Sequence, residues 1–148
     1  MANNPSKDVL LNDLYKNAHT ALQSISNLMP ELDDDKNAIK DELKEEYERY
    51  EKYMSELSHY MKDCKIERKD INPMKKAMMW GAVKMNTAFD TCDTHVADIM
   101  LKGTLMGITD VTAMLNGTNG AVPEDVQKFA EELLKIEEQH EKNLKRFL

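Results

Sequence analysis

The stretch FDTCDTH, residues 89–95, decides the fold, because it interrupts the longest helical pattern in the chain. Apolar residues recur at helical spacing on both sides of it, from about residue 73 to about residue 116. At 1.5 Å per residue, an unbroken helix over that range would be roughly 65 Å long. Aspartate and threonine compete for backbone hydrogen bonds and favour helix ends, so the two aspartates and two threonines of this stretch predict a break. One continuous, overhanging helix is the alternative.

With a break there, the chain divides into two pairs of long helices, joined by a shorter helical connector at about 73–90. Two helical hairpins joined by one long crossover are typical of ferritin-like bundles. No alternating pattern typical of strands occurs. We therefore predict an all-α, ferritin-like four-helix bundle that forms a single domain over residues 1–148, with the connector between the second and third long helices. The long helices are expected near 7–33, 35–65, 93–116 and 123–147.

Each long helix carries apolar residues three and four positions apart, which predicts one face turned toward a common core. In the second and third long helices the predicted inward positions are Leu43, Tyr47, Tyr50, Met54, Leu57, Met61, Cys64, Cys92, Ile99, Met106 and Met114. Gly103 and Gly107 lie four apart within the third long helix, where each glycine costs about 1 kcal/mol relative to alanine. They predict close packing of this helix on a large side chain such as Tyr50 or Phe129, or a pocket against the glycines.

The composition excludes several functional classes. The 148 residues carry a net charge of −7, whereas general nucleic-acid binding needs a basic face. The longest apolar run, AMMWGAV, has seven residues and is too short to span a membrane. The N-terminal stretch MANNPSKD lacks the apolar segment of a signal peptide, and two cysteines make no disulfide framework. We expect a cytoplasmic protein that binds neither nucleic acid nor membranes.

Three stretches together resemble a family of small, uncharacterised ferritin-like proteins from Firmicutes: LYKNAHTALQSISNLMPELDDD, THVADIMLKGTLMGITDVTAML and KIEEQHEKNLKRFL. The third long helix of that family has a similar pattern of small and apolar residues. It is matched here by Val96, Ala97, Met100, Leu101, Gly103, Gly107, Ile108 and Asp110. The resemblance covers nearly the whole chain. It implies a ferritin-like fold and a bacterial cytosolic protein, and it implies no particular activity.

A ferritin-type di-iron centre needs a glutamate from each of two helices and Glu-x-x-His from each of the other two. The last helix has this pair, Glu137 and His140. The second helix has Glu46, but Arg49 follows it three residues later, and an arginine cannot ligate a metal. The first helix has no carboxylate on its inward stripe. A complete di-iron centre is therefore not predicted.

A reduced site for iron or zinc remains as a hypothesis, because Glu46, Glu137 and His140 converge if the chain has the crossover topology. Under the competing hypothesis Glu46 or Glu137 forms an ion pair with Arg49 at the edge of the core. Arg49 distinguishes the two: a metal site leaves it facing solvent, and a structural cluster pairs it with one of these carboxylates.

His95 and Asp110 are outside candidates for the metal site. Cys92 and His95 also have the spacing of zinc ligands, but a structural zinc site needs four ligands and no second Cys/His pair accompanies them. Packing of Cys92 as a small apolar residue is the simpler interpretation.

A cluster of large apolar residues on the connector predicts an interface, because a connector helix has few neighbours to bury it. The cluster consists of Met74, Met78, Met79, Trp80 and Met85. We expect a homo-oligomer, most simply a dimer, or a complex with a protein partner. No nucleophile elbow, phosphate-binding loop or catalytic triad is present in the sequence. The leading hypothesis is a non-catalytic bundle that acts in assembly or partner binding, and the alternative is a metal-binding protein.

Overall fold

The computed structural model describes residues 5–69, 90–118 and 120–148. Within these ranges the chain forms four long helices: α1 (Pro5–Leu28), α2 (Ile39–Asp63), α4 (Asp93–Thr118) and α5 (Glu124–Leu144). Short 3-10 turns follow α1 at Met29–Glu31 and α5 at Lys145–Phe147. The described ranges contain no strand, so the predicted all-α four-helix bundle is confirmed. None of the helices in these ranges is long and apolar enough to cross a membrane.

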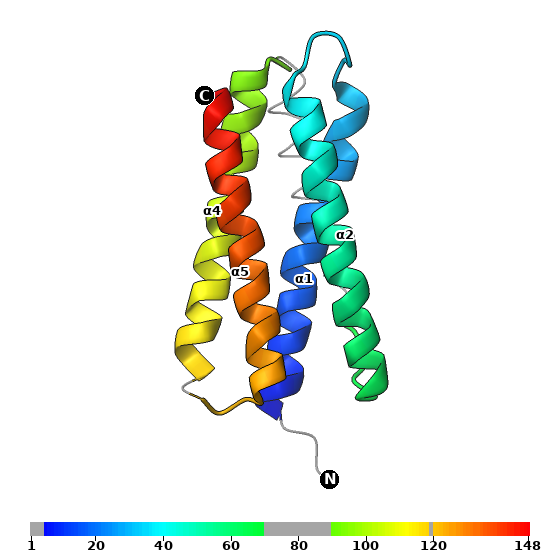
Figure 1. Cartoon of the computed structure of the whole chain (residues 1–148), viewed down its shortest axis with the longest axis vertical. Helices are drawn as coiled ribbons and strands as arrows, with labels where there is room; N and C mark the ends of the chain where they lie inside the picture. Colours follow the sequence, from blue (N-terminus) through cyan, green and yellow to red (C-terminus); the bar gives the residue numbers. More distant parts are fainter. Residues whose placement is uncertain (1–4, 70–89, 119) are drawn as a thin grey trace.

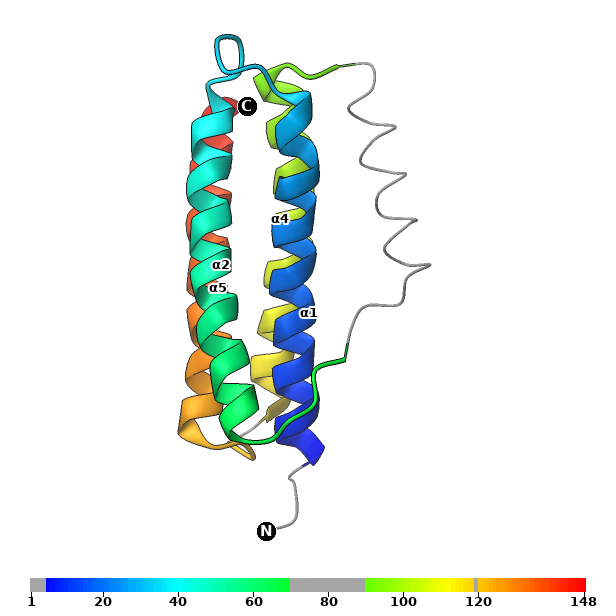
Figure 2. The same cartoon turned by 90° about the vertical axis from the view of Figure 1, so that its right-hand side faces the viewer.

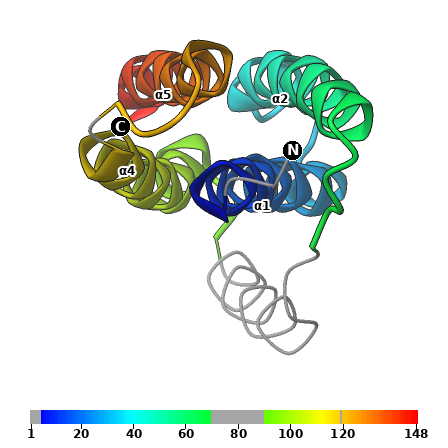
Figure 3. The same cartoon turned by 90° about the horizontal axis from the view of Figure 1, so that it is seen from below.

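The four helices form two antiparallel hairpins, α1 with α2 and α4 with α5 (Figure 1). Helix α2 ends at one end of the bundle and α4 begins at the other, so these two helices run in the same direction. Seen from the side and from the end, α2 and α5 form one layer and α1 and α4 form the second (Figures 2 and 3). Glu46 of α2 is therefore placed beside α5 instead of at the opposite end of the bundle.

The predicted break in the helical pattern is present, because residues 90–92 are not helical and α4 begins at Asp93. Asn37, in the loop between α1 and α2, donates to the carbonyl of Thr91 (2.7 Å) and to the carboxylate of Asp93 (2.9 Å). The same carboxylate accepts the backbone N–H of Ala38 at 3.1 Å. The loop thus fixes the start of α4, and the alternative of a continuous helix through residue 93 is wrong. The predicted connector and its apolar cluster lie outside the described residues, apart from Asp90.

The core is built from the apolar stripes that the helical spacing predicts. Its largest fully buried side chains are Tyr50, Tyr53, Leu11, Leu14, Ile25, Leu28, Ile39, Leu43, Leu57, Met61, Leu133 and Leu144. Helix α1 ends earlier than predicted, because Pro30 cannot continue the α-helical hydrogen bonds and the chain tightens into the 3-10 turn. Burial of the predicted stripes of α1, α2 and α5, and of a different face of α4, is the main stabilising contribution to the bundle.

Helix α4 buries a different face from the predicted one. Cys92, which precedes the helix, is exposed, and the Met106 side chain is 70% exposed. Its buried residues are Val96, Ala97, Met100, Leu101 and Val111. The prediction failed because α4 has apolar residues on nearly every side, so spacing alone does not select the inward face.

Candidate metal centre

Three ionisable side chains are buried in the core between α2 and α5. The exposed fraction is 1% for Glu46, 1% for Glu137 and 0% for His140. Each lies on the inward stripe of its helix, which the burial of neighbouring apolar residues forces to face the core. Glutamate is rarely fully buried without a partner, so two such residues in one small core require an explanation.

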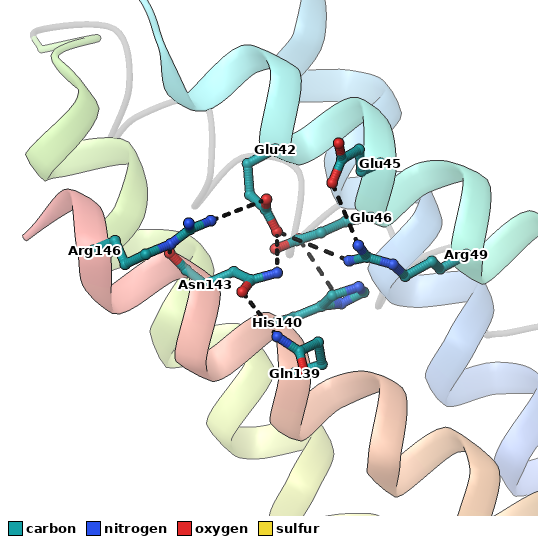
Figure 4. Close-up of polar contacts among 8 residues, drawn as sticks. All are labelled: Glu42, Glu45, Glu46, Arg49, Gln139, His140, Asn143 and Arg146. Carbon is teal, nitrogen blue, oxygen red and sulfur yellow. Dashed lines mark hydrogen bonds and ion pairs between the residues drawn. The ribbon is translucent and has the colours of Figure 1, made fainter.

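Four polar atoms of these residues are buried and make no hydrogen bond to any described residue: Glu46 Oε1, Glu137 Oε2, and both ring nitrogens of His140. The nearest approach is His140 Nδ1 to Glu46 Oε2 at 3.9 Å, which is too long for a hydrogen bond (Figure 4). Buried polar groups in folded proteins are nearly always satisfied by protein, water or an ion. This cluster is therefore the clearest candidate for a binding site in the described part of the chain.

The carboxylate of Glu137 packs against the backbone of α4 at Gly107. A Cβ atom added to Gly107 would lie 2.8 Å from Glu137 Oε1, so no larger residue fits there without moving the carboxylate. At Gly103, no atom of the described residues lies within 4 Å of the corresponding position. From the helix lengths, the crossover topology predicts Gly103 opposite Glu137. That prediction is wrong by one helical turn, because Glu137 lies against Gly107. The sequence predicted a large side chain such as Tyr50 or Phe129 against the glycines, whereas the three atoms nearest to a Cβ on Gly107 all belong to the Glu137 carboxylate.

The buried environment favours the uncharged form of both carboxyl groups. Burial, with a smaller contribution from Glu42, raises the pKa of Glu46 to about 8, against an opposing effect of Arg49. Burial and the nearby charge of Asp110 raise the pKa of Glu137 to about 8. At neutral pH, both carboxyl groups are therefore largely protonated when nothing is bound to them.

The imidazole of His140 is likewise uncharged. Burial, together with the positive charge of Arg49, lowers its pKa to about 3. Its ring meets the ring of Tyr50 edge-on, with centroids 4.9 Å apart. Burial raises the pKa of Tyr50 well above its ordinary value, and the charges of Glu137 and Glu46 add to this. Tyr50 thus borders both carboxyl groups and the imidazole, a neighbour that the sequence alone did not indicate.

A third buried glutamate, Glu42, closes the cluster toward solvent, and Figure 4 shows it beside the site. Its carboxylate accepts a 2.7 Å hydrogen bond from Asn143 and lies 3.5 Å from Arg146 and 3.9 Å from Arg49. Glu42 is only 7% exposed. It was missed from the sequence, although its position one turn before Glu46 on the same stripe was a usable signal.

Arg49 does not pair with either buried glutamate of the cluster. It contacts Glu45 at 3.3 Å and Glu42 at 3.9 Å, and its side chain is 38% exposed. No ion pair joins it to Glu46 or Glu137 in the described part of the chain. Arg49 therefore meets neither expectation: it pairs with neither Glu46 nor Glu137, but it does not simply face solvent either, because its Nη1 is buried near Glu42.

The residues present do not fit a di-iron centre, because one Glu-x-x-His pair and one further glutamate supply three of six ligands. They fit a single ion in kind: two carboxylates and one imidazole are suitable ligands for iron or zinc. In the present structure, however, these side chains lie too far apart to coordinate one ion. Among the described residues, no group of three or more His, Cys, Asp or Glu side chains lies close enough to hold a metal ion.

The outside candidates lie at other places. His95 is in the first turn of α4, near Asp90, whose pKa is lowered by hydrogen bonds from Cys92 and then by the charge of His95. Asp110 is exposed on α4, about one turn beyond Gly107, and acts on Glu137 from outside the core. Neither residue forms a metal-binding group with the buried cluster.

Comparisons of this chain with models of protein families, with curated proteins and with solved structures gave no match. The fold and the site define an all-α bundle with a buried cluster of two carboxyl groups and an imidazole between α2 and α5.

Proposed function

We propose that this protein is a ferritin-like bundle that binds one divalent metal ion, iron or zinc, between α2 and α5. The ligands are Glu46, Glu137 and His140. The observation that carries the proposal is the set of four buried donor atoms on these side chains without a hydrogen-bond partner. Two hairpins whose middle helices run in the same direction, the arrangement of ferritin-like bundles, also support it.

The energetic argument concerns the cost of leaving these atoms unpaired. Each buried polar group without a partner costs about 1–3 kcal/mol of stability. A cluster of unpaired polar atoms in an otherwise apolar core is most simply explained by a ligand that binds these atoms. A metal ion would do so for the carboxylates and the imidazole together, and it would draw the three side chains closer than they now lie.

Three protein ligands leave a metal ion with an open coordination position, as in catalytic and transport sites. When bound, the ion would supply Lewis-acid or redox chemistry according to its identity. The chain's own residues hold it and limit the access of water. Tyr50 covers the imidazole from the core, and Glu42 with Asn143 covers the cluster from the surface.

A metal-free, non-catalytic bundle is the second candidate. It is favoured by the spacing of the side chains, which forms no ready metal-binding group in the described ranges. It is also favoured by the raised pKa values of the two glutamates, because two protonated carboxyl groups can be buried at lower cost than two charges.

Metal content of protein purified without chelator, measured by mass spectrometry together with Fe(II) and Zn(II) titrations, separates the two candidates. We expect one ion per chain in the wild type and none in Glu46→Gln or His140→Ala. Glu46→Gln keeps the side-chain volume, so its loss of metal is not a consequence of a cavity. His59→Ala, which removes an exposed histidine of α2, is the matched control and should retain the metal. A wild-type protein that takes up neither ion would refute the proposal.

A further inference from the structure

The two layers of the bundle differ sharply in charge. Helices α2 and α5 carry 13 charged residues in 25 positions and 10 in 21. Helices α1 and α4 carry only four each, in 24 and 26 positions. Helix α4 lies at a corner of the bundle (Figure 3), so part of its charge-poor surface faces outward. A surface of this kind is typical of an interface.

The outward face of α4 is apolar at its centre. The Met106 side chain is 70% exposed and that of Leu105 is 41% exposed. Thr109, one turn further on, donates its hydroxyl to the carbonyl of Leu105 at 2.8 Å, so this polar group is already satisfied within the helix. Three neighbouring positions thus present mainly methyl and thioether groups to solvent.

Gly103 lies on the same outward side, and no contact among the described residues explains it. A glycine inside a helix costs about 1 kcal/mol relative to alanine. At Gly107 the contact with Glu137 accounts for it, whereas nothing lies within 4 Å of a Cβ placed on Gly103. A flat, open position one turn from an exposed methionine is suited to receiving a side chain from another molecule.

The charges around this face are arranged so that the face complements itself. Lys102 and Asp110, of opposite sign and both exposed, lie four residues before and four residues after Met106. Lys102 also pairs with Asp98 of its own helix at 2.7 Å, an exposed i,i+4 contact that contributes little and leaves the ammonium open to a second carboxylate. Rows of residues four apart are the ridges that align in the commonest class of helix packing. A two-fold axis at Met106 reverses the second helix, so Lys102 of each copy meets Asp110 of the other.

We propose that a second copy of this chain packs on α4, antiparallel, along the row Lys102, Met106 and Asp110. The inference does not depend on the metal site. The net charge of −7 opposes association through the highly charged layer, whereas this row brings two pairs of opposite charges together. A contact between single helices is small compared with stable interfaces of about 1,600 Å², so the dimer should dissociate on dilution.

Sedimentation velocity over a series of protein concentrations tests the inference. We expect a monomer–dimer equilibrium in the wild type and a monomer in Met106→Glu, which places two like charges at the axis. Val9→Glu, at an exposed valine of α1, is the matched control and should remain dimeric. Because all these positions are exposed, circular dichroism should show unchanged helix content in each variant.

Charge reversal tests the proposed register itself. Lys102→Asp and Asp110→Lys should each weaken the dimer by about tenfold or more, since like charges then meet. The double variant, and an equimolar mixture of the two single variants, should dimerise again, because opposite charges face each other in both. A wild type that stays monomeric at near-millimolar concentration would overturn the proposal, as would a dimer that survives Met106→Glu or a mixture that fails to associate.

Discussion

His140 Nδ1 lies 3.9 Å from Glu46 Oε2, and both side chains are almost completely removed from solvent. They come from helices on opposite sides of the connector and meet only because α2 and α4 run in the same direction. An up-and-down arrangement of the same four helices would place Glu46 roughly 15 Å from Glu137, the other glutamate of the cluster, at 1.5 Å per residue. The topology of the bundle therefore creates the one cluster in the described residues that calls for a ligand.

The free protein should lose stability as pH rises. The pKa of Glu46 is raised in the folded state to about 8 from 4.5, so the folded state binds more protons than the unfolded state between these values. Glu46→Gln, which imitates the protonated carboxyl, should remove part of this loss. We expect it to raise the free energy of unfolding of metal-free protein by about 1–3 kcal/mol at pH 8.5 and to change it little at pH 5. Urea unfolding at both pH values, with chelator present, measures this.

The control for this effect is Glu45→Gln, one residue earlier on α2, where the carboxylate is 62% exposed. Its effect on stability should be the same at both pH values within about 0.5 kcal/mol. An equal pH dependence in the wild type and in Glu46→Gln would show that the Glu46 carboxyl is not held protonated in the core.

Metal binding should release protons and strengthen with pH. Both glutamates have a pKa of about 8 in the free protein, and an ion must displace their protons to bind. If both are ligands, the affinity for Zn(II) should rise by up to about a hundredfold per pH unit below pH 8, and then level off. Titration calorimetry in buffers of different ionisation enthalpy counts the protons released. A count of zero would mean that Zn(II) binds elsewhere.

The contact between Gly107 and Glu137 gives a matched pair of glycine variants. Gly107→Ala places a methyl group 2.8 Å from the Glu137 carboxylate, the far end of a flexible side chain that must shift within the core. After the gain of about 1 kcal/mol from helix propensity, we expect a net loss of up to about 2 kcal/mol in the free energy of unfolding. Gly103→Ala meets nothing and should gain up to about 1 kcal/mol from helix propensity. Thermal unfolding at low concentration, where the chain is monomeric, compares them. Equal effects of the two substitutions would contradict the placement of Glu137 against Gly107.

The helices and their order could be predicted from the sequence because their signals are local. The break before Asp93 follows from residues that favour helix ends, and the inward placement of Glu137 and His140 follows from the spacing of the last helix. The outward position of Met106 could not be predicted, because α4 is apolar on nearly all sides. The one-turn error at Gly103 arose because helix register across the bundle depends on tertiary packing.

The ion-pair partners of Arg49 could not be predicted from the sequence for a different reason. Glu42, Glu45 and Glu46 all lie within reach of it along α2, so the spacing permits an ion pair with each of them. Burial decides among them. Glu46 is drawn fully into the core, whereas the partly exposed Arg49 pairs with the exposed Glu45 and approaches the buried Glu42 at 3.9 Å.

Asn37 should be the most sensitive position outside the core. Its amide donates to Thr91 and Asp93, and its Oδ1 accepts the backbone N–H of Asp33 at 2.9 Å. Asn37→Ala removes three hydrogen bonds from a residue that is only 6% exposed, so we expect a loss of about 2–4 kcal/mol. Lys36→Ala, at its exposed neighbour, should cost less than about 0.5 kcal/mol. Hydrogen exchange should show the added opening at the start of α4 as well as in the loop, because Asn37 joins the two. Opening confined to the loop would mean that α4 is held by its own packing on α5 and not by this contact.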